Sequence, residues 1–111
     1  MELRHLRYFT AVAEELHFGR AAARLNIAAP TVSHQIRALE TLLATKLFTR
    51  RTKSAVALTR SGKRFLVEAQ DTLKQAAHAE QIGRQSMLAG FRNDHPDVSF
   101  QLGPIFSWAG S

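Results

Sequence analysis

Six residues between positions 30 and 37 have the side chains best suited to recognising another molecule. They are Pro30, Thr31, Ser33, His34, Gln35 and Arg37. Hydroxyl and amide groups can hydrogen-bond base edges or phosphates of DNA, and a guanidinium group binds phosphate well. We therefore predict that Ser33 and Gln35 contact bases or phosphates, and that Arg37 contacts a phosphate. The alternative is that these residues form the ordinary polar face of a helix.

Pro30 and Thr31 also mark the beginning of this predicted helix. Proline is tolerated in the first turn because the N–H group that it lacks would have no partner there. The free N–H groups of a first turn and the helix dipole favour a nearby anion, so these amides could approach a phosphate. Helix initiation alone also explains the two residues.

Three cationic residues, Arg50, Arg51 and Lys53, lie in the basic segment from 48 to 59. Cationic side chains beside a reading helix can enter the minor groove or contact the DNA backbone. The alternatives are a solvated basic loop or, for Arg50, an internal tie to an acid such as Glu40. We predict DNA contact for Arg51 and Lys53, and both possibilities stay open for Arg50.

The charge of the chain is distributed unevenly. The net charge is +6, but residues 1–64 contain twelve Lys and Arg against four Asp and Glu, whereas residues 65–111 contain three against five. A basic half without a membrane anchor most often faces nucleic acid, although it could also be a solvated surface. The chain has no run of about 18 apolar residues and no signal-peptide pattern. We therefore expect a cytoplasmic protein without a membrane partner.

The residue types that catalyse reactions or bind metals show no recognisable pattern. The chain has no cysteine, and its five histidines, at 5, 17, 34, 78 and 95, lack metal-ligand spacing. A glycine-rich phosphate loop, an HExxH motif and a nucleophile elbow are all missing from the sequence. We predict no catalytic residues, no metal, no cofactor and no enzymatic activity.

Three helices are needed to position the polar residues. Apolar residues recur at helical spacing within 2–16, 18–25 and 30–44, and Asn26 suits the left-handed conformation that ends the second helix. Alternating Val56 and Leu58 favour a small two-stranded wing within 48–59. Thr59 is a good N-cap for a long helix from 60 to about 90. The predicted fold class is mostly α, with a three-helix core, a small β wing and a long helix.

The apolar residues of the long helix form a thin, alanine-rich seam. So long a helix cannot bury its seam against so small a domain, so we expect a second copy of the chain to cover it. The alternative is that the helix folds back onto its own domain. The predicted seam residues are Phe65, Leu66, Ala69, Leu73, Ala76 and Ile82.

Several motifs occur in the order and spacing of one known family. They are LRHLRYF from residue 3, AAARL from residue 21, PTVSHQIRALE from residue 30, LFTR from residue 47 and LTRSG from residue 58. Over residues 1–90 the chain resembles the DNA-binding domain of LysR-type transcriptional regulators. The resemblance implies a winged helix-turn-helix, a long helix that forms a dimer, and control of transcription.

The resemblance also implies a ligand-binding domain after the long helix, of which residues 91–111 match only fragments. We therefore expect a truncated regulator that binds no small-molecule effector, with a poorly ordered tail over 91–111. The family commonly has Ser-Gln where this chain has Ala28-Ala29, and Arg where it has His34. These differences predict a missing N-cap and a weaker, pH-dependent contact from His34.

Together these observations predict three segments: a winged helix-turn-helix DNA-binding domain over 1–59, a dimerisation helix over 60–90, and the tail. The predicted function is sequence-specific binding of double-stranded DNA by a homodimeric transcriptional regulator. Two alternatives stay open. The chain could act as a dominant-negative dimerisation partner of a full-length regulator, or as a nonspecific nucleoid-type DNA-binding protein.

Overall fold

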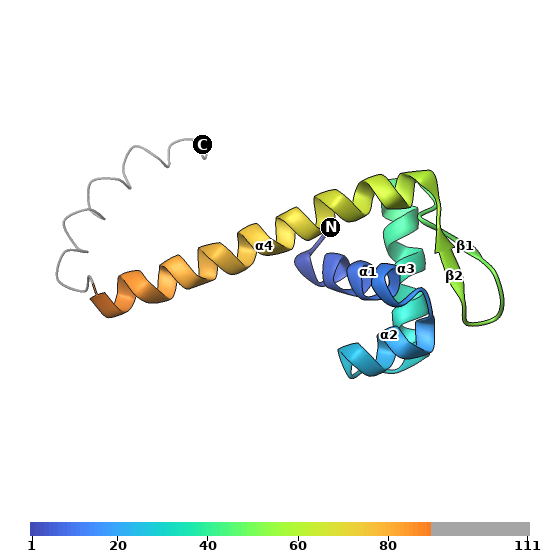
Figure 1. Cartoon of the computed structure of the whole chain (residues 1–111), viewed down its shortest axis with the longest axis horizontal. Helices are drawn as coiled ribbons and strands as arrows, with labels where there is room; N and C mark the ends of the chain where they lie inside the picture. Colours follow the sequence, from blue (N-terminus) through green and yellow to red (C-terminus); the bar gives the residue numbers. More distant parts are fainter. Residues whose placement is uncertain (90–111) are drawn as a thin grey trace. The chain divides into compact units, whose positions relative to one another are not determined.

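The computed structural model describes residues 1–89, with side chains described for residues 1–86. Within that part of the chain the elements follow in the order α1 (Leu3–Glu15), α2 (Phe18–Leu25), α3 (Ala29–Leu43), β1 (Phe48–Arg50), β2 (Val56–Leu58) and α4 (Arg60–Ala89) (Figure 1). The predicted mostly α fold with a small wing and a long final helix is confirmed. The predictions for residues 91–111 lie outside the described residues.

Left-handed residues end the first three helices. Leu16, Asn26 and Ala44 have φ values of 55°, 61° and 55°. The prediction for Asn26 is confirmed, since its N–H donates to the carbonyls of Ala22 and Ala23. Leucine and alanine rarely adopt this conformation, so their types give no signal that Leu16 and Ala44 end helices.

The core lies where α1, α2, α3, the wing and the first turns of α4 meet. Phe9 of α1 is fully buried at its centre. Its ring centroid lies 5.4 Å from that of Phe48 and 4.9 Å from that of Phe65, the second pair being edge-on. Edge-on and tilted aromatic pairs are favourable geometries, and each ring removes a large apolar area from water. The first turns of α4 are therefore part of the core of the domain.

The wing is a two-stranded antiparallel sheet that is attached to the helices. Phe48 pairs with Leu58, and Arg50 pairs with Val56. A further antiparallel bridge joins His17 to Ala55. A lone hairpin is marginally stable in water, so this bridge and the burial of Phe48 help to hold the wing in place.

α4 begins at a capped turn that fits closely against the chain before β1. Thr59 is confirmed as its N-cap, since the Thr59 hydroxyl accepts a 2.9 Å hydrogen bond from the N–H of Gly62. A Cβ atom at Gly62 would lie 2.1 Å from the carbonyl oxygen of Leu47, so only glycine allows this approach.

The later part of α4 lies outside the first compact unit, which ends at Lys74. Residues 77–86 are all exposed. None of the helices within residues 1–89 has the length and apolar character that crossing a membrane requires.

Candidate nucleic-acid interface

α3 divides into a buried face and a polar face. Val32, Ile36 and Leu39 are at most 3% exposed and fix the orientation of the helix. The predicted contact residues lie on the remaining surface: Pro30, Thr31, His34 and Arg37 are exposed, and Ser33 and Gln35 are half-buried. Packing of the apolar face therefore leaves the polar side chains available to a ligand.

The first turn of α3 offers fewer free amides than the sequence suggests. Ala28 is the N-cap residue and makes no side-chain cap, as its residue type predicts. Pro30 has no N–H, and the N–H groups of Thr31 and Val32 donate to the Ala28 carbonyl at 3.0 and 3.2 Å. Residues 30–32 therefore have no free N–H group with which to bind a phosphate, contrary to what was expected of these amides from the sequence.

The structure brings the polar face of α3 and the wing to one small cleft. Ser33 and Arg37 of α3 and Arg50 of β1 all line this cleft, whose volume is about 100 Å³. Within it, the Arg37 guanidinium donates a 3.1 Å hydrogen bond to the Ser33 hydroxyl. Residues of two predicted contact sites, separate in the sequence, thus meet at one cleft, whose lining also includes the apolar side chains of Phe18, Ile36, Phe48 and Val56.

Arg50 is engaged within its own domain. Its guanidinium lies 5.1 Å from the centroid of the Phe18 ring and donates a 2.7 Å hydrogen bond to the Lys53 carbonyl. The internal alternative is thus observed, but the partner is not Glu40. Cation–π contact and the carbonyl hold Arg50 as a support for the wing tip.

Arg51 and Lys53 lie at the exposed tip of the wing. Neither forms an ion pair with any of residues 1–89. The tip is shaped by the Thr52 hydroxyl, which accepts hydrogen bonds from the N–H groups of Ser54 and Ala55. The tip therefore presents two free cations on an ordered turn, which suits contact with a phosphate backbone.

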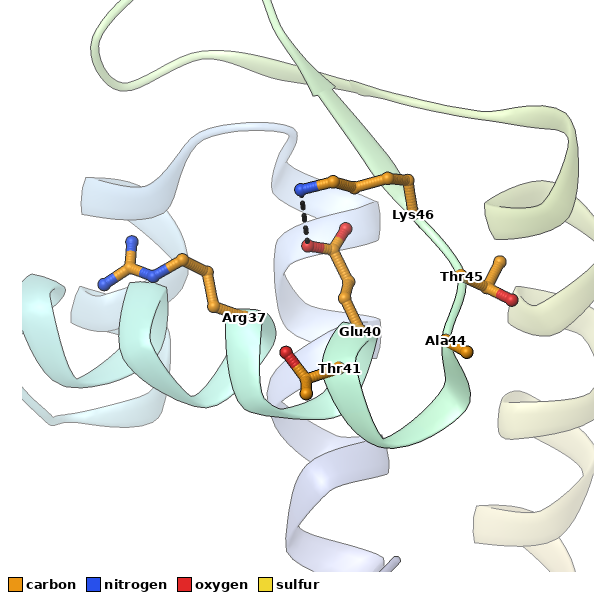
Figure 2. A pocket seen from close by; sticks show the side chains of 6 residues that line it. All are labelled: Arg37, Glu40, Thr41, Ala44, Thr45 and Lys46. Carbon is orange, nitrogen blue, oxygen red and sulfur yellow. Dashed lines mark ion pairs between the residues drawn. The ribbon is translucent and has the colours of Figure 1, made fainter.

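A wider, open pocket lies at the end of α3 (Figure 2), with a volume of about 380 Å³. Its lining includes Arg37 and also Lys46, a cation that the sequence analysis did not single out. The Lys46 ammonium lies 3.9 Å from Glu40, and its side chain is 80% exposed. Its position three residues beyond the end of α3 is the one sequence signal that could have suggested this residue.

Glu40, near the end of α3, also stabilises the beginning of β1. Its carboxylate accepts hydrogen bonds from the N–H groups of Leu47 at 2.8 Å and Phe48 at 3.2 Å. These contacts fix where β1 begins relative to α3. Glu40 therefore lines both pockets and at the same time holds the beginning of β1 beside α3.

The residues predicted for a dimer seam divide into two groups. Phe65, Leu66 and Leu73 are partly buried against the core of their own chain, as in the fold-back alternative. Ala69 is corrected to a core residue, because it is 1% exposed and has no surface left for a partner. The last two predicted residues remain available: Ala76 is half-buried and Ile82 is 46% exposed.

Val67, which the sequence analysis did not include, is 55% exposed on the same helix. Phe65, Leu66, Ala69 and Leu73 pack against the core of their own chain. The prediction treated the apolar residues of α4 as a single stripe, whereas one side of the helix packs on its own domain and the exposed apolar residues are scattered elsewhere on it.

A polar junction ties α4 to the first two helices. Glu14 accepts hydrogen bonds from Arg24 at 2.6 Å and from Gln70 at 3.1 Å. The hydrogen bond from Arg24 holds the pKa of the Glu14 carboxyl below its usual value, and Glu14 in turn raises the pKa of Arg24. Gln70 therefore connects α4 directly to the helix pair that precedes α3.

Comparison with known proteins gives consistent matches. Residues 3–63 match the family described as "Bacterial regulatory helix-turn-helix protein, lysR family". The uncharacterized HTH-type transcriptional regulator YnfL of Escherichia coli is 44% identical over 91% of this chain and 42% of its own length. The regulator XapR of Escherichia coli is 53% identical over 75% of this chain and 29% of its own length. The chain thus spans less than half the length of these curated relatives.

Solved structures of DNA complexes are also similar. The DNA-binding domain of BenM with catB site 1 DNA has a TM-score of 0.75 and 39% identity, over 78% of this chain and 96% of that one. The DNA-binding domain of CbnR with DNA has a TM-score of 0.73 and 36% identity, over 78% of this chain and 99% of that one. Each likeness covers more than three-quarters of this chain.

Proposed function

Because this chain belongs to the LysR family of bacterial helix-turn-helix regulators, we propose that it binds specific sequences of duplex DNA as a homodimer and thereby regulates transcription. One observation carries the proposal: Ser33 and Arg37 of α3 share a cleft with the base of the wing. A polar helix face beside a cationic wing tip fits a major groove and its flanking backbone at the same time. The similar domains of BenM and CbnR were solved with DNA.

We assign the six α3 residues to the major groove. Thr31, Ser33, His34 and Gln35 would meet base edges or nearby phosphates, with Pro30 setting the start of the helix. Arg37 reaches a phosphate, and Lys46 lies beside it on the same pocket. Direct contacts to base edges give sequence preference, whereas phosphate contacts position the helix.

We assign the wing to the DNA flanking the major groove. Arg51 and Lys53 would contact the backbone or the minor groove, because they are exposed and free of ion pairs within residues 1–89. Arg50 supports the tip from below through Phe18 and the Lys53 carbonyl. Phosphate neutralisation by these cations would supply much of the affinity and make it sensitive to salt.

We assign dimerisation to α4. The exposed apolar residues Val67 and Ile82, with Ala76 between them, are available to a second copy. A symmetric pair would place two reading helices on a palindromic site. Residues 1–59 would thus form the DNA-binding segment and residues 60–90 the dimerisation segment. Since its target is the bacterial chromosome, the protein would act in the cytoplasm, and the regulatory family supports no catalytic role.

The experiment that tests this proposal is selection of bound sequences from a random duplex pool at moderate salt, followed by titration of the best duplex. We expect enrichment of a palindrome whose half-sites lie about one or more helical turns apart. Gln35→Ala should weaken binding to the selected duplex far more than to random DNA, whereas Arg84→Ala, on an exposed part of α4, should change neither. Equal affinity for all sequences, with a simple loss of binding as salt rises, would instead favour the nonspecific nucleoid-type alternative.

A further inference from the structure

Ser33 and Arg37 lie one helical turn apart on the polar face of α3. The Arg37 guanidinium donates a 3.1 Å hydrogen bond to the Ser33 hydroxyl oxygen. Both residues line the small cleft that α3 forms with the wing. Arg37 is exposed and Ser33 is half-buried. The hydrogen-bonded pair therefore lies on the surface that is proposed to meet DNA.

Arg37 is directed to Ser33 because Glu40, on the same helix, is engaged by other groups. The Glu40 carboxylate accepts two backbone hydrogen bonds from the beginning of β1 and lies 3.9 Å from the Lys46 ammonium. Figure 2 shows the Arg37 guanidinium pointing away from this pair. Within residues 1–86, Arg37 forms no ion pair. A guanidinium has five N–H donors, so the bond to Ser33 leaves others for a phosphate.

The hydrogen bond from Arg37 determines how the Ser33 hydroxyl can be used. A serine hydroxyl has one proton to donate and lone pairs with which to accept. In helices this proton often goes back to the carbonyl four residues earlier, as the Thr72 hydroxyl donates to Glu68 at 2.8 Å. Within the part of the chain that the structure describes, Ser33 accepts from Arg37 and donates to no protein group. Because a charged donor polarises the oxygen, the hydroxyl becomes a better donor of its own proton.

We propose that Arg37 is a positioning residue that orients the Ser33 hydroxyl as a donor, so that Ser33 recognises a hydrogen-bond acceptor on the DNA and not an amino group. The inference rests on the proposed function, which assigns Ser33 to the DNA without saying what kind of atom it contacts. The acceptors that a major-groove helix can meet are purine N7, guanine O6, thymine O4 and phosphate oxygens. The amino groups of adenine and cytosine are the donors that Ser33 would not select.

The test is a double-mutant cycle on the duplex that the wild-type protein selects. Ser33→Ala should weaken binding roughly three- to tenfold in the wild-type background, as is usual for one hydrogen bond. In the Arg37→Met background the same change should cost less than about twofold, because a hydroxyl without Arg37 can turn back to its own helix. Equal costs of Ser33→Ala in the two backgrounds would overturn the inference.

The matched control for the cycle is Thr31→Ala. Thr31 is exposed on the same helix, and its hydroxyl forms no hydrogen bond with Arg37. Its substitution should therefore cost the same in both backgrounds. If Thr31→Ala also loses its effect in the Arg37→Met background, the loss reflects a displaced helix, and the specific role of Arg37 is wrong.

A second measurement identifies the acceptor. The duplex is synthesised with one acceptor removed at a time, using deazapurines that lack N7, aminopurine that lacks O6, a pyrimidinone that lacks O4, and methylphosphonate linkages that lack a charged oxygen. At one position the replacement should abolish the cost of Ser33→Ala. A base analogue at that position would assign the acceptor to a base edge, and a methylphosphonate would assign it to the backbone. If Ser33→Ala stays equally costly with every replacement, Ser33 does not act as a donor and the inference is wrong.

Failure of the proposed function would give a different result. Equal affinity of the wild-type protein for all sequences would count against a sequence-specific regulator. The cycle can then be measured on any duplex, so the coupling between Ser33 and Arg37 is tested in either case.

Discussion

Glu40 joins the end of α3 to the beginning of β1 through one carboxylate. Both of its backbone partners, Leu47 and Phe48, are buried. Glu40→Ala should lower the free energy of unfolding by about 1–3 kcal/mol, because two buried N–H groups lose their acceptor. Urea denaturation measures this loss. Glu40→Gln, which retains one acceptor oxygen, should lose less.

The matched control for that substitution is Glu80→Ala, since Glu80 is exposed on α4. Its stability should remain within about 0.5 kcal/mol of wild type, as is usual for surface positions. Equal losses in the two alanine variants would show that the Glu40 carboxylate does not fix the strand.

Glu14 predicts a stability that depends on pH in the acid range. Its pKa is lowered by the hydrogen bond from Arg24, so its stabilising contribution is present above the pKa of the unfolded chain and is lost as the pH falls through the folded value. Both side chains are at least 40% exposed, so the contribution should stay below about 1 kcal/mol. Glu14→Gln should therefore reduce the loss of stability on acidification, measured by urea denaturation at several pH values. An unchanged acid profile would contradict the role of this junction.

At the scale of the element, alanine substitutions at the two glycines of α4 should have opposite effects on stability. A Cβ at Gly62 would lie 2.1 Å from the Leu47 carbonyl oxygen, whereas a Cβ at Gly83 would have no atom within 4 Å. Gly62→Ala should destabilise the domain by about 1–3 kcal/mol or more, because backbone must move. Gly83→Ala should increase helix stability by up to about 1 kcal/mol, because alanine has the better helix propensity. Thermal unfolding followed by circular dichroism compares the two, and a neutral Gly62→Ala would show that the α4 cap region can shift freely.

The helices, the wing and their order were predictable from sequence because apolar spacing and turn residues each have a local signal. Asn26 and Thr59 are examples, since each ends or begins a helix through its own side-chain preference. Leu16 and Ala44 end helices only because the packed elements require it, and nothing local predicts that. The contacts of Arg50 and Ala69 were likewise not predictable from local sequence. Those of Arg50 depend on its tertiary contact with Phe18, and the burial of Ala69 depends on which side of α4 packs against the core.

At the scale of the whole molecule, the proposed dimer depends on the exposed apolar residues of α4. Ile82→Glu places a charge where a second copy is proposed to pack, so it should shift the protein toward monomer in sedimentation equilibrium. Gln81→Glu, which adds the same charge at the neighbouring exposed position, serves as the control and should remain dimeric. A dimer that tolerates both substitutions would place the interface elsewhere on the chain.

The contact of Phe65 with Phe9 has a consequence for how the protein is made. Residues 1–58 contain every element proposed to contact DNA. The Phe9 ring at the centre of their core is nevertheless covered on one side by Phe65 from the first turns of α4. During synthesis the nascent chain would therefore expose an apolar aromatic surface until α4 emerges from the ribosome, which at about 5–20 residues per second takes on the order of a second. A fragment of residues 1–58 should show poorly dispersed amide resonances, and a fragment of residues 1–74 should show a folded spectrum. The helix proposed to join two copies is thus also the segment that completes the folding of each copy during synthesis.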